Sequence, residues 1–454
     1  MRDAAGGMRT EHDMLGTVLV PADALYGAQT RRAVVNFPLR GQRSLGEFPH
    51  VVRALVLVKQ AAAMANGRAG CLDARLADAI VAAGGDVFDR ELYNQFPIHH
   101  LHGGGGTSAN MNANEVIANL AEERLGGRRG EYRIVHPIEH VNRHQSTNDV
   151  YPTACHLAIL LRWPEIEPDL RALVESMGVR AAQLSGRPRI ARTCLQDAVA
   201  VDFGDLLGGY AALLRRGWAH AAAAVDALHA VNLGGSIVGR LDDVPGGYAE
   251  AVVPALREIT GDPCYVRSDN LFDAAQNIDD LVRVSSELNV LARGLVKVCR
   301  DLRLLSSGPE AGLGEIRLPA MQPGSSAMPG KVNPVMPEHA IQLCLKATGL
   351  HAGCQAALDH GELDLNVWEG LVTFGILESM ELIAAAANAV ADRCIGGLEV
   401  VAERNEANVR TVIPLLAQLA RRHGYAAVTA VVQRAPQGGP ALRRLLAEAF
   451  PDDV

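Results

Sequence analysis

Aromatic residues are scarce in this 454-residue sequence, where Phe, Trp and Tyr together account for 4%. Strand-like alternation of apolar and polar residues is also scarce, whereas alanine is abundant. These features favour an all-α protein whose helices pack closely on small side chains. The eight cysteines are scattered, without a CxxC pair or a Cys/His group at the spacing of zinc ligands. We therefore expect reduced thiols and a cytoplasmic protein.

Concentrated positive charge and long apolar runs are missing too. The chain has 43 Lys and Arg against 51 Asp and Glu, a net charge of −8, and no basic cluster. Nucleic acid is therefore not an expected partner. The longest uncharged stretch, residues 92–114, is interrupted by glycines, asparagines and histidines, so we expect no membrane span. Residues 1–16 lack the apolar core of a signal peptide.

Several motifs with a known chemical role are absent from the sequence. There is no phosphate-binding GxxxxGK[ST], no GxGxxG after a predicted strand, and no GxSxG turn around a nucleophilic serine. There is also no HExxH and no EF-hand loop. We therefore expect neither a bound metal ion nor a cofactor, and the chemistry should depend on uncharged donors and single charged groups.

The residues that are present describe long helices. Residues 51–66 contain neither Gly nor Pro and predict a helix that ends at Gly67. Residues 271–305 contain no Pro and place apolar side chains at every third or fourth position, which predicts one amphipathic helix about 50 Å long. A helix of that length needs long neighbours that cover its apolar face. The candidate neighbours are residues 169–185, 203–231 and 366–394.

Glycine and proline gather between these helices and indicate where the chain divides. With soft boundaries near residues 145 and 396, we predict three domains. They are a mixed but mostly helical N-terminal domain over 1–145, a central bundle of long helices over 146–396, and a small helical C-terminal domain over 397–454. The glycine and proline clusters lie at residues 102–107, 233–239, 308–337 and 432–440.

Four separated segments are rich in glycine, hydroxyl groups or asparagine, as the lining of a binding pocket would be. Each also has an ordinary structural explanation. For residues 103–115 it is a glycine loop before a capped helix, and for residues 140–149 it is a helix cap. For residues 191–197 it is a helix start, and for residues 313–338 it is a surface loop.

The fourth segment has the strongest chemical signature. Ser325 and Ser326 follow Gly324, and a single lysine, Lys331, stands shortly before Asn333. A Gly-Ser-Ser turn supplies backbone N–H groups and hydroxyls, and the lysine supplies a full positive charge for an oxyanion. Together with the uncharged donors of the other segments, this set suits a small dianionic acid that gains negative charge during the reaction.

Four motifs in collinear order resemble the fumarase/aspartase superfamily, and the resemblance extends from about Arg9 to Cys394. The motifs are GTSANMNANEV at 106–116, HQSTNDVYPT at 144–153, RTCLQDAV at 192–199 and GSSAMPGKVNP at 324–334. Residues 11–30 are also similar to the N-terminal segment of the family. Three shorter stretches resemble the aspartase branch more than the fumarases: NFPL at 36–39, DLRLLSSGP at 301–309 and LNVWE at 365–369.

The resemblance implies an all-α, three-domain fold in which the central bundle of long helices forms a tetrameric helical core. It also implies a homotetramer whose active sites each take segments from three subunits. The implied substrate is a small dicarboxylic amino acid, and the implied partners include neither nucleic acid nor a membrane.

The resemblance also implies roles for individual residues. Ser325 matches the catalytic base of the family, and Glu338 matches an acidic residue that supports acid/base chemistry in fumarases. Lys331 and Asn333, with Thr193 from another segment, match the residues that hold one substrate carboxylate. The other implied substrate-binding residues are Thr107, Ser146, Thr147, Asn148, Cys194, Ser326 and Met328.

The implied reaction eliminates ammonia from L-aspartate and gives fumarate through an aci-carboxylate intermediate, with a loop serine as base. The alternatives are a lyase for a modified aminosuccinate, a fumarate hydratase and, outside the enzymes, a catalytically silent structural protein on the same scaffold. Cys194 stands where the family commonly has His or, in some aspartases, Gln, and Glu310 stands where Arg is usual. Both departures allow a modified substrate.

Overall fold

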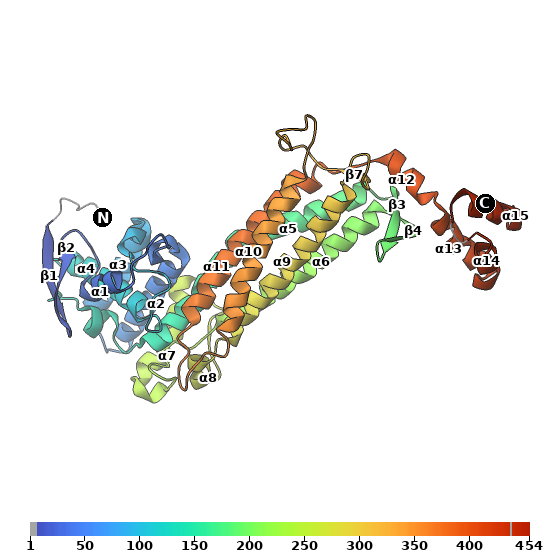
Figure 1. Cartoon of the computed structure of the whole chain (residues 1–454). Coiled ribbons are helices and arrows are strands. Elements are labelled where there is room, and N and C mark those ends of the chain that lie inside the picture. The colour runs from blue at the N-terminus through green and yellow to red at the C-terminus, as the bar shows by residue number, and fades with distance from the viewer. Residues whose placement is uncertain (1–6, 436–437) are drawn as a thin grey trace. The chain divides into compact units, whose positions relative to one another are not determined.

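A computed structural model describes residues 7–435 and 438–454, which form mainly helices (Figure 1). These residues contain helices α1 to α15 and eight short strands in four two-stranded sheets. Residues 1–6, at the start of the region without a signal-peptide core, lie outside the described part. So do residues 436 and 437, which belong to the glycine and proline cluster predicted at 432–440.

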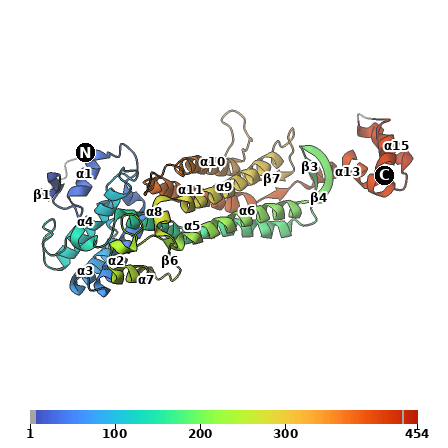
Figure 2. The same cartoon turned by 90° about the horizontal axis from the view of Figure 1, so that it is seen from below.

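The helices belong to two compact units. The first unit contains residues 1–166, 220–289 and 347–381, and the second contains residues 167–219, 290–346 and 382–454. The five longest helices each contribute residues to both units. They are α5 (Thr147–Gln183), α6 (Phe203–Asp226), α9 (Asp279–Leu305), α10 (Val335–Ala356) and α11 (Glu369–Val390), drawn from green to orange in Figures 1 and 2. The division into three domains stays a prediction.

Helix α2 (Pro49–Arg68) is the central helix of the first unit, and most of its side chains are buried. The helix predicted over 51–66 is therefore present, but it does not end at Gly67. Helix α3 approaches so closely that a Cβ added at Gly67 would lie 3.0 Å from the Cβ of Ala77, so this glycine serves close packing inside the helix. The neighbours of α2 are α3 (Ala74–Asp89), α4 (Thr107–Arg124) and α7 (Gly246–Thr260).

The remaining elements of the first unit are short. One of them, α1, begins against Glu115 of α4, whose carboxylate accepts the N–H groups of Gly27 at 2.7 Å and Gln29 at 2.8 Å. Burial raises the pKa of Glu115 to about 7, although these hydrogen bonds oppose the shift. The short elements are the antiparallel pair β1 (Met8–Asp13) and β2 (Gly16–Pro21), α1 (Ala28–Asn36), the parallel pair β5 (Ala230–Val231) and β6 (Val266–Arg267), and α8 (Leu271–Gln276).

The single helix predicted over 271–305 is interrupted. Helix α8 ends at Gln276 and α9 begins at Asp279, so the long helix has 27 residues, which makes it about 40 Å long. Between them Asn277 is extended (φ −121°, ψ 147°). Its side-chain amide donates a 2.6 Å hydrogen bond to Asp273. Side-chain bonds of this kind compete with helix continuation, and the spacing of apolar residues contains no sign of them.

Four of the long helices pack around an apolar core in the second unit. Helices α6 and α9 approach closely at Gly217, where an added Cβ would lie 3.1 Å from the side chain of Leu291. The apolar stripe predicted for this part of α9 is buried. The side chains that meet around a small cavity are Leu170, Leu173, Val174, Leu214, Trp218, Leu291, Leu295 and Ile383.

The rest of the second unit consists of two small sheets and a helical C-terminal part. Strands β3 (Pro188–Thr193) and β4 (Gln196–Asp202) form an antiparallel hairpin. Residues 191–197 therefore lie in this hairpin, and the explanation of this segment as a helix start is wrong. Leu419 and Leu446 lie in a separate small core formed by the last three helices. The other elements are β7 (Ile316–Arg317), β8 (Glu399–Val400), α12 (Ala402–Val409), α13 (Val412–His423), α14 (Tyr425–Val432) and α15 (Gly439–Ala449).

One helical segment of the described chain, Glu369–Ile395, is long and apolar enough to cross a membrane. It comprises α11 and the turn that follows it. Within its most apolar stretch, 67% of the residues are buried inside the protein, which is the pattern of a core helix in a soluble fold.

Gly106→Ala should destabilise the start of α4 more than Gly104→Ala. Both glycines have a positive φ, 86° and 92°, and this conformation costs other residues about 1–2 kcal/mol. An alanine Cβ at position 106 would also lie 2.2 Å from the ring of the buried Tyr151, whereas nothing lies within 4 Å at position 104. Urea unfolding of both variants measures the difference. Equal losses of unfolding free energy would show that the contact with Tyr151 imposes no constraint.

Candidate active site

The N-termini of α4 and α5 bring together the expected site residues of the first unit. Thr107 begins α4 and Thr147 begins α5. Asn110 connects the two helices, because its amide donates a 3.0 Å hydrogen bond to the hydroxyl of Thr147. Next to them, the hydroxyl of Ser146 accepts the N–H of Asn148 at 3.2 Å. Helix N-termini present free N–H groups and positive dipole ends, so this arrangement favours an anion.

A half-buried amide, Asn142, links these helices to α2. Its Oδ1 accepts hydrogen bonds from Lys59 Nζ at 2.8 Å, from Asn110 at 3.2 Å and from Asn114 at 3.1 Å. Lys59 also donates to Gln145 at 2.9 Å, and its side chain is completely buried. The analysis of the sequence missed Lys59 and Asn142 as members of the site. The one available signal was a single lysine within the apolar run 51–66.

Lys59 and Asp149 are a coupled pair of buried titratable groups. Burial lowers the pKa of Lys59 from its usual 10.5 to about 7, and the charge of Asp149 opposes this shift. Burial raises the pKa of Asp149 from 3.8 to about 6, and hydrogen bonds from backbone N–H groups and the charge of Lys59 oppose that shift. The N–H groups of Ser146 and Gly234 each donate to this carboxylate at 2.9 Å. Asp149 therefore holds the start of α5 against the 233–239 loop.

The second unit holds the glycine-serine loop, whose ends are tied together. The N–H of Gly324 donates to the carbonyl of Lys331 at 2.8 Å, and the amide of Asn333 donates to the carbonyl of Gly324 at 2.9 Å. Ser325 and Asn333 are half-buried. The loop is therefore a closed turn that holds its serine and its asparagine at fixed positions.

The hydroxyl oxygen of Ser325 faces two backbone donors. It accepts the N–H of Ala327 at 3.1 Å and the N–H of Met328 at 2.9 Å. Donors that point at an oxygen stabilise its deprotonated form. Ser325 therefore has the surroundings that a serine needs in order to act as a base.

Lys331 supplies the positive charge beside this serine. Ser325 and Lys331 line the same open hollow of about 430 Å³. The lysine is exposed and forms no ion pair with any other residue that the structure describes. Ser326 and Met328 of the same loop are exposed as well. A free ammonium and a serine oxygen in one hollow suit a carboxylate whose neighbouring carbon loses a proton.

Thr193 and Cys194 lie at the exposed tip of the β3–β4 hairpin. Thr193 pairs with Gln196, which leaves Cys194 and Leu195 as a two-residue turn. Both turn residues have positive φ, 51° and 61°, a conformation in which Asn and Gly are usual in such turns. A strained turn of non-glycine residues is held by its surroundings and is found most often at functional sites.

A buried carboxylate, Glu315, anchors this hairpin within the second unit. It forms an ion pair with Arg192 of β3 and accepts the side-chain amide of Asn408 at 2.9 Å. Its side chain is completely buried. Glu315 also lies directly before the strand that leads to the glycine-serine loop, so the hairpin and this segment share one anchor.

The remaining expected residue, Glu338, lies in the first turn of α10. Its carboxylate is 3.2 Å from Arg303 of α9, and both side chains are partly exposed. Among the described residues it has no hydrogen bond to Ser325. The expected site residues are therefore divided between the two units. Thr107, Ser146, Thr147 and Asn148 belong to the first unit, and Thr193, Cys194, Ser325, Ser326, Met328, Lys331, Asn333 and Glu338 belong to the second.

The chain is similar to known proteins over almost its whole length. A family model described as "Lyase" matches residues 16–349. An aspartate ammonia-lyase from Pseudomonas aeruginosa is 40% identical over 441 residues, which cover 97% of this chain and 93% of that protein. A class II fumarate hydratase from Ralstonia nicotianae is 40% identical over 436 residues, covering 96% and 94%. The chain belongs to the fumarase/aspartase superfamily.

Solved structures of superfamily members have the same fold. A fumarate lyase from Brucella melitensis, described as delta crystallin and bound to cobalt, matches with a TM-score of 0.93 and 41% identity, covering 98% of this chain and 97% of that one. A class II fumarase from Schistosoma mansoni matches with a TM-score of 0.92 and 32% identity, covering 97% and 95%. The predicted superfamily and its all-α fold are therefore confirmed. Because hydratases and ammonia-lyases are equally similar, membership of the superfamily establishes a lyase but not its leaving group.

Replacing Lys59 by Met should change how the stability of this superfamily member depends on pH. The pKa of Lys59 is about 7 in the folded chain against 10.5 ordinarily, so the unfolded chain binds an extra proton between these values. The free energy of unfolding then rises with pH in this window, by at most about 1.4 kcal/mol per pH unit from this group. Urea unfolding between about pH 8 and 9.5 should show this rise in the parent and a smaller one in Lys59→Met. The exposed Lys297→Met serves as control, and equal slopes in all three proteins would contradict the buried-lysine assignment.

Proposed function

We propose that this protein is an ammonia-lyase that converts L-aspartate, or a close aminosuccinate, into fumarate and ammonium. The observation that carries the proposal is Cys194, a thiol next to Thr193 at the exposed tip of the hairpin. The superfamily commonly has a histidine at this position. A hydratase has to protonate a leaving hydroxyl group, whereas an ammonium group leaves without a strong acid, so the thiol suits ammonia elimination better.

In the proposed reaction, the Ser325 alkoxide removes a proton from the substrate carbon beside one carboxylate. The electron pair of the broken C–H bond moves into that carboxylate and forms a dianionic aci-carboxylate. Lys331 and Asn333, together with Thr193, stabilise the added charge. The electron pair then returns to form the carbon–carbon double bond while the C–N bond to the neighbouring carbon breaks with its electrons on nitrogen, and the released ammonia takes up the proton that Ser325 removed. The products are fumarate and ammonium.

The other site residues bind the rest of the substrate. Thr107, Ser146, Thr147 and Asn148 hold the second carboxylate and the amino group with uncharged donors at two helix N-termini. Ser326 and Met328 line the same end of the substrate as Ser325, and Glu338 supports the proton transfer. No step of this reaction needs a metal ion or a cofactor.

The site residues are proposed to meet in a homotetramer, in which the first-unit residues, Thr193 and Ser325 reach one active site from three different subunits. The long helices of the second unit support this assembly, because they expose large apolar side chains where a partner subunit would cover them. These side chains are Val179, Val290, Leu304 and Leu345. A cytoplasmic location agrees with the buried, reduced state proposed for most of the cysteines.

A lyase for an N-substituted aminosuccinate is the second candidate. Glu310 supports it, because an acidic residue stands where the superfamily usually has Arg. The guanidinium of Arg404 donates to the carbonyl groups of Glu310 at 3.2 Å and Gly312 at 2.9 Å, so the segment around Glu310 keeps a fixed position. An acidic residue in this segment suits a basic substituent on the substrate amine.

Aspartate should be deaminated at least about 100-fold faster than malate is dehydrated, because a missing acid/base group costs about 10²–10⁴-fold. The assay follows fumarate absorbance with aspartate, malate and argininosuccinate supplied separately. Cys194→His should raise malate turnover more than deamination. Faster turnover of malate than of both amino compounds would overturn the ammonia-lyase proposal, and preference for argininosuccinate would select the second candidate.

Ser325→Ala should abolish turnover while its thermal unfolding stays close to that of the parent, because the hydroxyl lies on a loop outside the helical core. Thr193→Ala should also be strongly impaired. If the two residues reach one site from different subunits, unfolding and refolding the two variants together should restore part of the activity. No recovery in mixed tetramers would refute the shared site, and a parent-like rate of Ser325→Ala would refute the serine base.

A further inference from the structure

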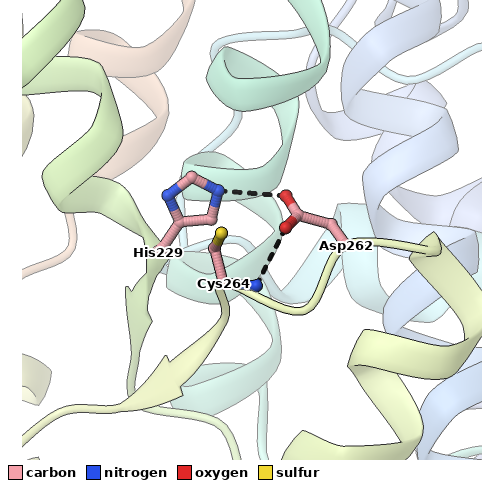
Figure 3. A group of neighbouring side chains, drawn as sticks. All are labelled: His229, Asp262 and Cys264. Atoms are coloured by element: carbon pink, nitrogen blue, oxygen red, sulfur yellow. Dashed lines mark hydrogen bonds and ion pairs between the residues drawn. The ribbon is translucent and has the colours of Figure 1, made fainter.

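Three potential metal ligands converge in the first unit, outside the residues proposed for catalysis. His229, Asp262 and Cys264 point toward one another in Figure 3. One ligand atom of each, an imidazole nitrogen, a carboxylate oxygen and the thiol sulfur, lies within 4.8 Å of both others. His229 lies more than thirty positions before Asp262 and Cys264, which is why the search for closely spaced Cys and His pairs did not find this group.

The backbone explains why these residues meet. His229 directly precedes strand β5, and Cys264 lies two residues before strand β6. The two strands pair in parallel, with Ala230 opposite Val266, so the segments that lead into them run side by side. Gly261 ends α7 with a φ of 72° and turns the chain toward Asp262. The convergence therefore depends on regular secondary structure and not on the position of a free loop.

The imidazole of His229 is oriented as in metal-binding histidines. Its Nδ1 lies 2.7 Å from the carbonyl oxygen of Asp226, so this nitrogen carries a proton and donates it to the backbone. Nε2 is hydrogen-bonded to Oδ2 of Asp262 at 3.0 Å, and a metal ion bound between these two atoms would replace this contact. Histidine ligands usually donate their second ring N–H to a carbonyl or carboxylate in this way, which leaves the other nitrogen available for a metal ion.

The carboxylate and the thiol complete the donor set. One oxygen of Asp262 accepts the N–H of Cys264 at 2.9 Å, and the other faces His229. The Cys264 side chain is exposed, so it can rotate toward the other two ligands. Around tetrahedral zinc, bond lengths of about 2.0–2.3 Å place ligand atoms roughly 3.4 Å apart. The ligand atoms here need only small side-chain movements to reach that spacing.

The combination of nitrogen, oxygen and sulfur ligands selects the chemical class of the ion. Thiolate and imidazole together favour borderline divalent metals such as Zn²⁺ and Co²⁺ over Mg²⁺ and Ca²⁺, which prefer oxygen ligands alone. Three protein ligands leave a fourth position for water or a further donor. His229 and Asp262 also line an open hollow of about 610 Å³ beside Trp163 and Tyr265, which gives this fourth position access to solvent.

We propose that His229, Asp262 and Cys264 form a binding site for a zinc-class divalent metal ion. Binding forms bonds from the metal to His229 Nε2, to a carboxylate oxygen of Asp262 and to the sulfur of Cys264, whose proton is released to solvent. The ion joins the end of α6 to the segment after α7, and so stabilises the first unit. This site is separate from the proposed elimination reaction, which needs no metal.

The site is tested by titrating the full-length, chelator-treated protein with Zn²⁺ against a chromophoric chelator, and by substituting Co²⁺. The parent should bind one Zn²⁺ per chain, and the cobalt form should show a thiolate-to-cobalt charge-transfer band. Thermal unfolding should occur at a higher temperature with Zn²⁺ present. Cys264→Ser should remove the band and weaken Zn²⁺ binding by at least about tenfold, and Asp262→Asn should weaken it as well.

Cys71→Ser is the matched control, because the Cys71 thiol is half-buried and lies near the carbonyl of Ala69 at 3.7 Å, apart from the proposed ligands. It should keep both the band and the Zn²⁺ affinity of the parent. Absence of stoichiometric binding, equal affinities of the parent and Cys264→Ser, or loss of the band in Cys71→Ser would each overturn the proposal. Cys264→Ser should form fumarate at the parent rate, so this test and that of the proposed reaction give independent answers.

Discussion

The first part of the proposed active site depends on one constraint: buried polar groups need hydrogen-bond partners. One amide oxygen, that of Asn142, accepts hydrogen bonds from Lys59 of α2 and from Asn110 and Asn114 of α4. Any displacement of these helices would leave a buried donor without a partner, which costs about 1–3 kcal/mol for each group. The same Asn110 donates to Thr147, so the network also fixes the start of α5. The positions of the uncharged donors proposed to bind the substrate thus follow from the hydrogen bonds of the core.

The glycine-serine loop places donors and a positive charge around Ser325. The proposed base needs them, because a serine hydroxyl is a weak base in water. Two backbone N–H groups already point at Ser325, and Lys331 lies in the same open hollow with its charge uncompensated by the described residues. These donors do not have to reorganise when negative charge appears on the serine oxygen or on the substrate. The proposed binding groups lie at helix ends and the proposed base lies on a tied loop, so recognition and proton transfer are assigned to different elements.

Specificity within the superfamily depends on few residues. Ammonia-lyases and hydratases of about 40% identity share this fold and its motifs, so the scaffold itself does not select the leaving group. Removal of a proton next to a carboxylate is common to both reactions. The step that differs is departure of the amine or the hydroxyl. In the proposed reaction, the side chain beside Thr193 distinguishes the two leaving groups, and here it is the thiol of Cys194 at the tip of the hairpin.

The superfamily, the helical class and the four motifs could be predicted from the amino-acid sequence, because motifs and helical periodicity are local properties. Which distant residues meet became visible only in the folded chain. Lys59 reaches Asn142 across 83 positions, and His229 meets Asp262 only because two short strands pair. The folded chain also shows that Asn277 interrupts the helix predicted over 271–305 and that Gly67 lies inside α2. Each of these outcomes depends on hydrogen bonds or close contacts whose energy is decided by neighbouring groups and not by the spacing of apolar residues.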